Sequence, residues 1–225
     1  MNYKMIRLLL LLFTCPIIYS WSQNNFNSQG EKQGVWFGYH ENGVIKYQGQ
    51  FINDNEVGVF KYYDYDGNLL VQLDYVQPGV KSQAILYYSS GSIKSEGQYL
   101  NQQKHSKWIY YSKHGSIIAT EHYMDGMLSG ESIYYYDNGR VSEKHHYVNN
   151  IKTGISEIFY PSGFLNLRCY YLNNKLHDIA KYYYDNSIQL ESIGKYFMGV
   201  KDSVWVFYNE LGDTLNIVDY RNSLD

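Results

Sequence analysis

Aromatic and aliphatic residues alternate with polar ones in short runs from about residue 31 onward. Val35–Tyr39 and Ile133–Tyr136 are such runs, and Val44–Phe51 and Val141–Tyr147 are longer ones. Alternation with a period of two predicts β-strands that are buried on one face. No helical period lies between the runs, and their spacing leaves no room for a crossover helix, so we expect successive strands to pair antiparallel.

The runs belong to a repeat of 24 residues that recurs about eight times. A typical unit has a glycine at its turn, an aromatic four residues earlier, a second aromatic eight residues later and an aliphatic two residues later, with small shifts in the last two units. The turn glycines are Gly43, Gly67, Gly91, Gly115, Gly139 and Gly163, followed by Ser187 and, after one inserted residue, Gly212. The aromatics before them are Tyr39, Tyr63, Tyr87, Tyr111, Tyr135, Phe159, Tyr183 and Tyr208. Such regular columns are the signature of a repeat architecture.

Each unit is predicted to be a hairpin. Asn42-Gly43, Asp66-Gly67 and Asn138-Gly139 favour a type I′ turn, whose two central residues need positive φ. A polar connector such as Asn149-Asn150 leads into the next unit. One hairpin cannot bury its own face, whereas a row of hairpins can. We therefore predict an all-β fold, an elongated and coiled antiparallel β-meander of roughly sixteen strands.

The N-terminus has the features of a secretory signal peptide. Lys4 and Arg7 precede the apolar run Leu8–Phe13, and Ser20-Trp21-Ser22 supplies small residues before Gln23. A lipoprotein anchored through Cys15 is a weaker interpretation, because the residues around Cys15 make a poor lipobox. An uncleaved membrane-associated helix is the third. All three place the protein outside the cytoplasm, so we expect a periplasmic or extracellular location.

The domain organisation follows from the leader and the repeat. Residues 1–22 are expected to be the signal peptide, 23–30 a short linker, 31–222 the repeat domain and 223–225 a tail. After cleavage no further apolar run has the length of a membrane span, so no integral membrane span is expected.

Composition narrows the choice of partner and of stabilising bonds. The chain has 27 Tyr, which favour half-buried β surfaces, and a net charge of −3. A mildly acidic chain has no basic footprint for nucleic acid. Cys15 lies in the expected leader, which leaves Cys169 alone and excludes an intramolecular disulfide. We expect Cys169 to be a packed thiol.

One unit carries a resemblance to a known family. The segment from Gly130 to Gly139, continued by Arg140 to Tyr147, resembles the bacterial variant of the MORN repeat found in proteins labelled YwqK-family antitoxins. The resemblance extends over about residues 31–222 and implies a non-enzymatic scaffold or binding surface. The chain departs from the pattern where Ser82, Ser106 and Asp178 replace the leading glycine of a unit, so those connectors are expected to be irregular.

No chemistry is predicted from the remaining residues. His122 and His146 share one repeat column, but a separation of two strands, about 9.6 Å, is too large for one Zn²⁺. His145 is expected on the other face, and the histidines are interpreted as solvated strand residues. No Gly-x-Ser-x-Gly motif or phosphate loop occurs. We therefore expect no catalytic, cofactor-binding or metal-binding residues, no cofactor and no enzymatic activity.

The candidate partner-binding residues are aromatic. Positions seven and five residues before the turn alternate to the face opposite Tyr39 and Tyr111, so both faces carry rings. Exposed rings anchor protein partners and stack on sugars. The candidates are Trp36, Trp108, Tyr110, Tyr134 and Trp205. The predicted function is an exported scaffold that binds protein at the bacterial cell envelope; the alternatives are a carbohydrate-binding module and an antitoxin or immunity protein that binds a toxin.

Overall fold

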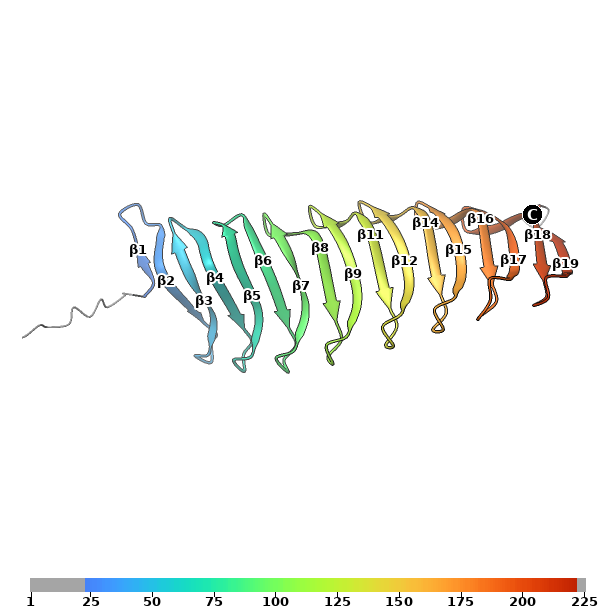
Figure 1. The fold of residues 1–225 in the computed structure, drawn as a ribbon. Helices are drawn as coiled ribbons and strands as arrows, with labels where there is room; N and C mark the ends of the chain where they lie inside the picture. The colour runs from blue at the N-terminus through green and yellow to red at the C-terminus, as the bar shows by residue number, and fades with distance from the viewer. Residues whose placement is uncertain (1–22, 222–225) are drawn as a thin grey trace, which may run out of the picture.

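The computed structural model describes residues 23–221, which form one long row of antiparallel hairpins (Figure 1). Sixteen strands were predicted, and nineteen are present because β1 precedes the first hairpin and two strands are interrupted near their starts. The first half comprises β1 (Asn25–Phe26), β2 (Lys32–Tyr39), β3 (Ile45–Ile52), β4 (Asn55–Tyr63), β5 (Leu69–Gln77), β6 (Lys81–Tyr87), β7 (Ile93–Leu100), β8 (Gln103–Tyr111) and β9 (Ile117–Met124). The second half comprises β10 (Met127–Leu128), β11 (Gly130–Tyr135), β12 (Val141–Val148), β13 (Ile151–Lys152), β14 (Gly154–Phe159), β15 (Leu165–Leu172), β16 (Lys175–Tyr183), β17 (Leu190–Phe197), β18 (Val200–Tyr208) and β19 (Thr214–Asp219).

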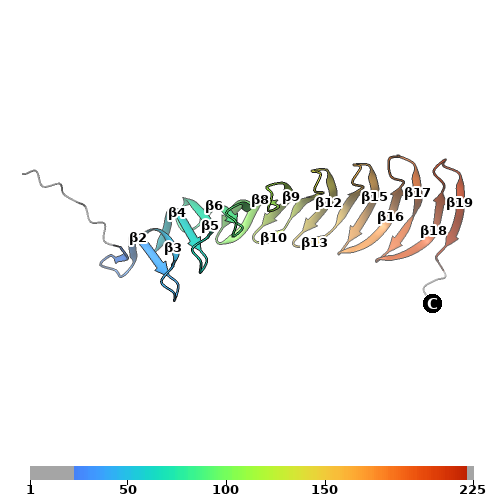
Figure 2. The same ribbon diagram turned by 90° about the horizontal axis from the view of Figure 1, so that it is seen from below.

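Every strand pairs with its neighbour in the chain, so the sheet is an open meander. The ladder runs from β1–β2 to β18–β19 without a crossover. The short β10 and β13 pair with β9 and β12, which also pair with β11 and β14. The turns line up along one side of the row and the connectors along the other (Figure 1). From below, the hairpins near the N-terminus are rotated relative to those near the C-terminus (Figure 2). The predicted all-β, coiled antiparallel meander is thus confirmed.

The hairpin turns do not have the predicted type I′ geometry, which occurs in the connectors. At the first turn, Gly43 N–H donates to His40 O and His40 N–H to Val44 O, and Gly43 has φ of 84° while Asn42 does not enter the positive-φ region. This geometry is a type I turn followed by a bulge glycine, not the predicted type I′ turn. Type I′ geometry occurs instead in the connectors, where both Asn149 and Asn150 have positive φ (50° and 66°).

The three connectors in which Ser82, Ser106 and Asp178 replace the leading glycine differ from one another. Ser106 and Asp178 keep the positive φ of the glycine they replace, at 59° and 58°, so those connectors are regular and the expectation was wrong for them. Ser82 lacks it, and the turn is made by Pro78-Gly79, with Val80 N–H donating to Gln77 O. Proline followed by a positive-φ glycine is typical of a type II turn.

The two faces of the sheet differ in burial. We call the face that bears the residues seven and five before each turn the core face. Its centre is the ring position, seven residues before the turn, which is occupied by Trp36, Phe60, Ala84, Trp108, Ser132, Ser156, Ala180 and Trp205. All eight are buried. We call the other face, which carries Tyr63 and Tyr111, the opposite face.

Large and small residues complement each other along the core face. Where the ring position holds Phe60, Trp108 or Trp205, the adjacent residue of the preceding strand is glycine, and a β-carbon there would overlap the ring. These glycines are Gly49, Gly97 and Gly194. Where the ring position is small, the equivalent residue of the preceding unit has a side chain in place of glycine: Leu73, Glu121, His145 and Cys169 precede Ala84, Ser132, Ser156 and Ala180. Side chains of adjacent units thus share space within a single layer.

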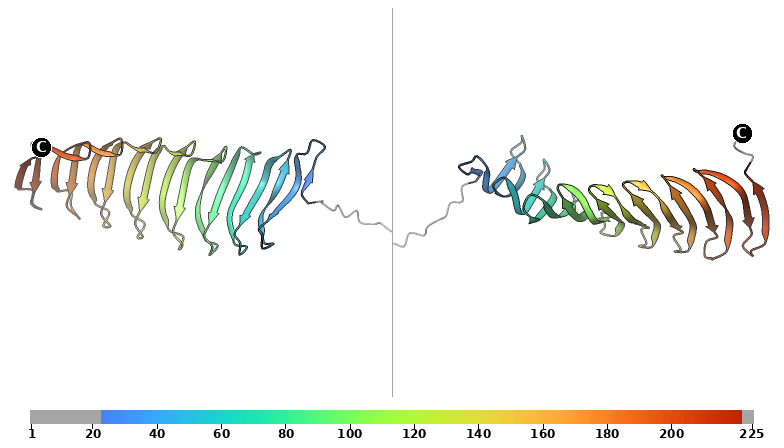
Figure 3. Two further views of the ribbon diagram at one scale, coloured as in Figure 1. Left: turned by 180° about the vertical axis from the view of Figure 1, so that it is seen from behind. Right: turned by 90° about the horizontal axis from the view of Figure 1, so that it is seen from above.

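The segment 23–30, expected to be a linker, contains β1. Asn25 and Phe26 pair with Gln33 and Lys32. The Phe26 ring meets Trp36 edge-on at 5.0 Å, so it supplies the neighbour that the first unit lacks. The residue inserted in unit 7 lies in the turn, where Tyr184 N–H donates to Gln189 O and Asn186 takes the positive φ. The row remains continuous across this turn (Figure 3).

Candidate functional site

The core face of unit 4 contains the densest group of polar and aromatic side chains. Trp108 is 0% exposed, and its Nε1 donates to Gln98 O at 3.1 Å. Tyr99 meets the indole edge-on at 5.0 Å and Tyr110 lies at 6.4 Å. The Lys104 ammonium lies 4.6 Å from the centre of the Trp108 ring. A cation over a ring face is stabilised by the ring quadrupole.

A chain of hydrogen bonds continues from this lysine toward unit 5. Lys104 Nζ donates to Tyr110 Oη at 2.8 Å, and Tyr110 Oη lies 3.0 Å from Tyr123 Oη. Tyr123 and Tyr134 donate to the two carboxylate oxygens of Glu121 at 2.6 and 3.1 Å. Burial and the Glu121 carboxylate raise the pKa of Tyr123 to about 12, since ionised phenol would face that negative charge. The phenols therefore act as donors at neutral pH.

The next strands place an acid, a histidine and a serine in line. His145 Nε2 lies 2.6 Å from Glu143 Oε2, and His145 Nδ1 lies 3.1 Å from Ser156 Oγ. The order resembles that of a nucleophilic triad. However, Ser156 is 0% exposed, so no substrate can reach its hydroxyl. We interpret the trio as a way of satisfying a buried imidazole, whose pKa burial lowers.

This arrangement corrects one expectation. His145 was interpreted as a solvated strand histidine, but it is buried on the core face. His146 is exposed on the opposite face, as the strand alternation predicted. Cys169 is buried with its Sγ 3.8 Å from Ser156 O, and burial raises the pKa of its thiol to about 11. It is thus the packed thiol that was predicted.

The predicted partner-binding aromatics all lie on the core face, but with different accessibility. Trp108 and Trp205 are 0% exposed and Trp36 is 8% exposed. Their rings pack between strands, which leaves little indole surface for a ligand. Tyr110 and Tyr134 are half-buried, with their hydroxyls in the network around Glu121. Any ligand at this face meets tyrosine and lysine side chains before it meets tryptophan.

The repeat-defining tyrosines occupy the opposite face. Tyr63 Oη accepts from Gln48 Nε2 at 2.9 Å, and Tyr111 Oη donates to Glu96 Oε1 at 2.6 Å. The tyrosine three residues before a turn binds the next unit instead. Tyr136 Oη, for example, donates to Phe159 O at 2.6 Å. These contacts tie neighbouring units together and explain the aromatic column without a ligand.

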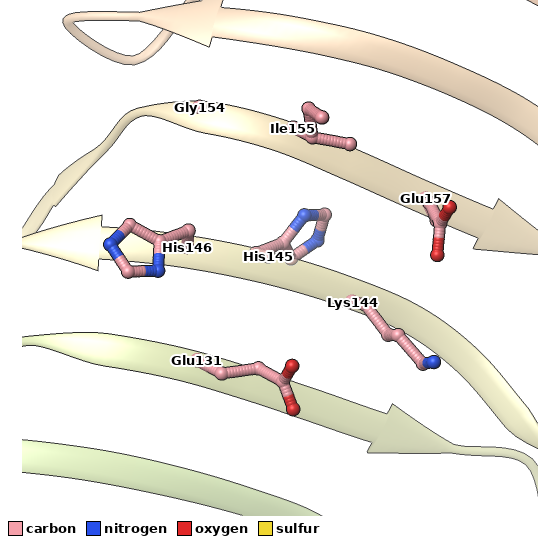
Figure 4. A pocket seen from close by; sticks show the side chains of 7 residues that line it. All are labelled: Glu131, Lys144, His145, His146, Gly154, Ile155 and Glu157. Carbon is pink, nitrogen blue, oxygen red and sulfur yellow. The ribbon is translucent and has the colours of Figure 1, made fainter.

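Charged residues alternate across the opposite face near the middle of the row. Glu131 lies across from His146, and Lys144 from Glu157. With Ile155 they line a shallow hollow of about 360 Å³ between β11 and β14 (Figure 4). Arg168 Nε lies 3.8 Å from Glu157 Oε1 on the other side. Within residues 23–221, no group of three or more His, Cys, Asp or Glu side chains is arranged to hold a metal ion.

Apolar side chains are exposed further along the same face. Ile155 lies across from Tyr170, and Ile179 follows on the next strand. These residues line a second hollow of about 310 Å³ together with Arg168 and Lys181. Val204 and Ile217, on β18 and β19, are exposed as well. Sequence inspection did not single out this row, although the residue eight before each turn is polar in units 3 to 5 and changes to Ile155, Ile179 and Val204 in the last three units.

The sheet and its regular units define a β-hairpin repeat protein. Four segments match the family model described as MORN repeat variant, at residues 32–53, 56–77, 83–101 and 128–149. They correspond to units 1, 2, 3 and 5, together less than half of the chain. None of the curated proteins matches.

Two solved structures show distant similarity. A crystal structure of TarM matches with a TM-score of 0.32 and 12% identity, over 42% of this chain and 19% of TarM. A mutant of S. aureus TarM in complex with fondaparinux, α-GlcNAc-glycerol and UDP matches with a TM-score of 0.33 and 12% identity, over 43% and 19%. The matching region thus spans about a fifth of the TarM chain. No helix in residues 23–221 has the length and apolar character needed to cross a membrane.

Proposed function

We propose that this protein is an exported, non-enzymatic repeat scaffold that binds a protein partner at the bacterial cell envelope. The observation that carries the proposal is the exposed apolar row on the opposite face, with Ile155, Tyr170 and Ile179 at its centre. Contiguous exposed apolar side chains in a stable protein mark interaction surfaces.

The chemistry around the row indicates the kind of partner. Arg168 and Lys181 lie across from each other beside the apolar side chains, and Lys195 lies across from Ile179. The Glu157 carboxylate lies 3.8 Å from Arg168 and Asp202 lies across from Lys195, so Lys181 alone has no acidic residue across from it. An apolar centre with a cationic margin suits a protein surface whose apolar patch is bordered by acidic residues.

The absence of enzymatic activity is proposed from the burial of the reactive groups. The Ser156 hydroxyl and the Cys169 thiol are enclosed in the core face, and the raised pKa of Cys169 keeps it protonated at neutral pH. Export is proposed from the signal-peptide features of residues 1–22, which lie outside the described residues.

A matched pair of variants tests the interaction surface. Ile179 and Val59 occupy equivalent positions of units 7 and 2, and both are 45% exposed. Affinity capture from envelope extract is compared between the native chain, Ile179→Glu and Val59→Glu. A specific partner is expected to be lost with Ile179→Glu and retained with Val59→Glu. Equal capture by all three chains would contradict the proposal, and binding on a glycan array, or protection from a co-expressed toxin, would favour one of the alternatives.

Export is tested separately by mass spectrometry of the mature protein. Cleavage after Ser22 predicts a chain that begins at Gln23. A diacylglyceryl group on Cys15 would instead show lipid anchoring. An intact leader in the cytoplasmic fraction would contradict export.

A further inference from the structure

Four units place a lysine of their own among the rings of the core face. The lysine position, eleven residues before the turn, holds Lys32, Lys104, Lys152 and Lys201 in units 1, 4, 6 and 8. Lys104 Nζ lies 4.6, 5.0 and 4.9 Å from the ring centres of Trp108, Tyr110 and Tyr123. Lys201 Nζ lies 4.2, 5.4 and 5.4 Å from Trp205, Phe207 and Tyr220. The protein itself therefore shows that such a ring cluster accepts an alkylammonium group.

Unit 2 has the same ring cluster without the lysine. Phe60, Tyr62 and Tyr75 occupy the positions of Trp108, Tyr110 and Tyr123. Phe60 and Tyr62 are 6.4 Å apart, as Trp108 and Tyr110 are, and Tyr75 meets Phe60 edge-on at 5.6 Å. The lysine position is occupied by Glu56. Every other large ring at the ring position is accompanied by a lysine: Trp36 by Lys32, Trp108 by Lys104 and Trp205 by Lys201.

The cluster of unit 2 has a negative charge and no cation. Within residues 23–221, no lysine or arginine lies over the rings of Phe60, Tyr62 or Tyr75, and the Glu56 carboxylate makes no ion pair. The proximity of Glu56 also contributes to the raised pKa of Tyr62 and Tyr75. A cation placed here would gain both the ring faces and a carboxylate.

Space for a ligand lies directly beside this cluster. Unit 3 has Ala84 at the ring position and Val80 at the lysine position, so no large ring fills the gap between Tyr75 and Tyr99. The result is a hollow of about 180 Å³, lined by Leu73, Tyr75, Gly79, Val80, Ser82, Tyr99 and Gln102. Gly79 N–H donates to Glu56 O, which joins the hollow to the strand that carries the acid.

We propose that Glu56, Tyr62 and Tyr75 bind an alkylammonium group, supplied by a lysine side chain of a partner protein. The aliphatic stem lies in the hollow toward Tyr99, and the ammonium lies against the two tyrosine rings and Glu56, above Phe60, which is 1% exposed and stays covered. The preference for an alkylammonium follows from the four internal lysines. Only the assignment of its source to a protein rests on the function proposed above. The site is on the core face, so it is independent of the apolar row on the opposite face.

The test uses Nα-acetyl-lysine N-methylamide as probe and the ring signals of labelled tyrosine as readout in NMR titrations. The probe is expected to shift the signals of Tyr62 and Tyr75, and the norleucine analogue, which lacks the ammonium, is expected not to. Glu56→Gln is expected to weaken binding at least about tenfold. Glu56→Lys places a lysine where four other units have one, and is expected to abolish probe binding in a chain that unfolds at an unchanged or higher temperature.

Glu131→Gln on the opposite face is the matched control and should bind the probe as the native chain does. Absence of shifts at Tyr62 and Tyr75, equal binding of the norleucine analogue, or undiminished binding by a folded Glu56→Lys chain would overturn the site. Tighter binding of tetramethylammonium than of the lysine probe would overturn its assignment to a protein lysine. Loss of partner capture by Ile179→Glu reports on the other face, so the two proposals fail independently.

Discussion

The indole of Trp108 lies directly on Gly97 of the neighbouring strand, where a β-carbon would overlap the ring. The same relationship joins Trp205 to Gly194 and Phe60 to Gly49. In units 3, 5, 6 and 7 a small residue at the ring position follows a residue with a side chain, as Ala84 follows Leu73. Side chains of adjacent units thus occupy the same space between them, so a change of side-chain size in one unit affects the packing of the next.

Substitution of Gly97 tests this coupling. Gly97→Ala is expected to destabilise the protein by about 1–3 kcal/mol, because the added methyl group displaces the Trp108 indole. Gly97→Leu combined with Trp108→Ala recreates the Leu73–Ala84 arrangement, and should be more stable than the sum of the single variants by about 0.5–3 kcal/mol. Thermal unfolding followed by circular dichroism measures both. Gln98→Ala, one residue away and on the opposite face, serves as control; strict additivity of the double variant would refute the coupling.

The architecture could be predicted from sequence because every unit repeats the same columns. The turn glycines, with Tyr63 and Tyr111 as examples of the aromatic column, fixed the strand boundaries and the two faces. The turn type was wrong because Asn-Gly satisfies two geometries, and only the bond from Gly43 N–H to His40 O distinguishes them. Strand β1 was missed because two residues carry too short a pattern, and Phe26 matters only through its contact with Trp36.

The connector residue Asn150 gives a prediction about backbone geometry. Its φ is 66°, its side chain accepts from Leu128 N–H at 2.7 Å, and its own N–H donates to Leu128 O. Asn150→Ala loses a hydrogen bond and strains the backbone, with an expected cost of about 1–3 kcal/mol. Asn150→Gly loses the bond alone and should cost less. Urea unfolding of the two variants ranks them; a glycine variant less stable than the alanine variant would show that strain is unimportant here.

The candidate sites were less predictable than the fold. The tryptophans attracted attention as binding residues, but a ring seven residues before the turn packs into the core face, which is why Trp108 and Trp205 are buried. The lysine position was visible as a column in the sequence. The contact of these lysines with the rings could not be predicted, because the distance from Lys104 Nζ to the Trp108 ring depends on the path of the folded backbone.

Burial of His145 predicts a dependence of stability on acidic pH. Burial lowers the pKa of this imidazole in the folded protein, whereas in the unfolded chain it titrates near its ordinary value of 6.5. Below that pH the unfolded chain binds a proton that the folded protein does not, so the free energy of unfolding falls as the pH falls. His145→Gln is expected to flatten the profile below about pH 6.5 relative to the native chain. His146→Gln, exposed on the opposite face, should leave the profile unchanged; an identical effect of both substitutions would count against the assignment.

The tyrosine network predicts that the stability of the protein also depends on pH in the alkaline range. Here the titrating groups are acids, which the folded protein keeps protonated. The pKa of Tyr111 and that of Tyr123 are each raised to about 12, through a hydrogen bond to Glu96 and through burial with Glu121 respectively. Between pH 10, where an unfolded tyrosine ionises, and 12 the unfolded chain loses protons that the folded protein keeps, so stability falls as the pH rises. Tyr123→Phe removes one titrating phenol and should reduce this slope, and Tyr39→Phe, at an exposed ring, should not. Phenolate absorbance near 295 nm, recorded with circular dichroism, should show ionisation of the network tyrosines only as the sheet unfolds; smooth ionisation in an intact sheet would contradict the prediction.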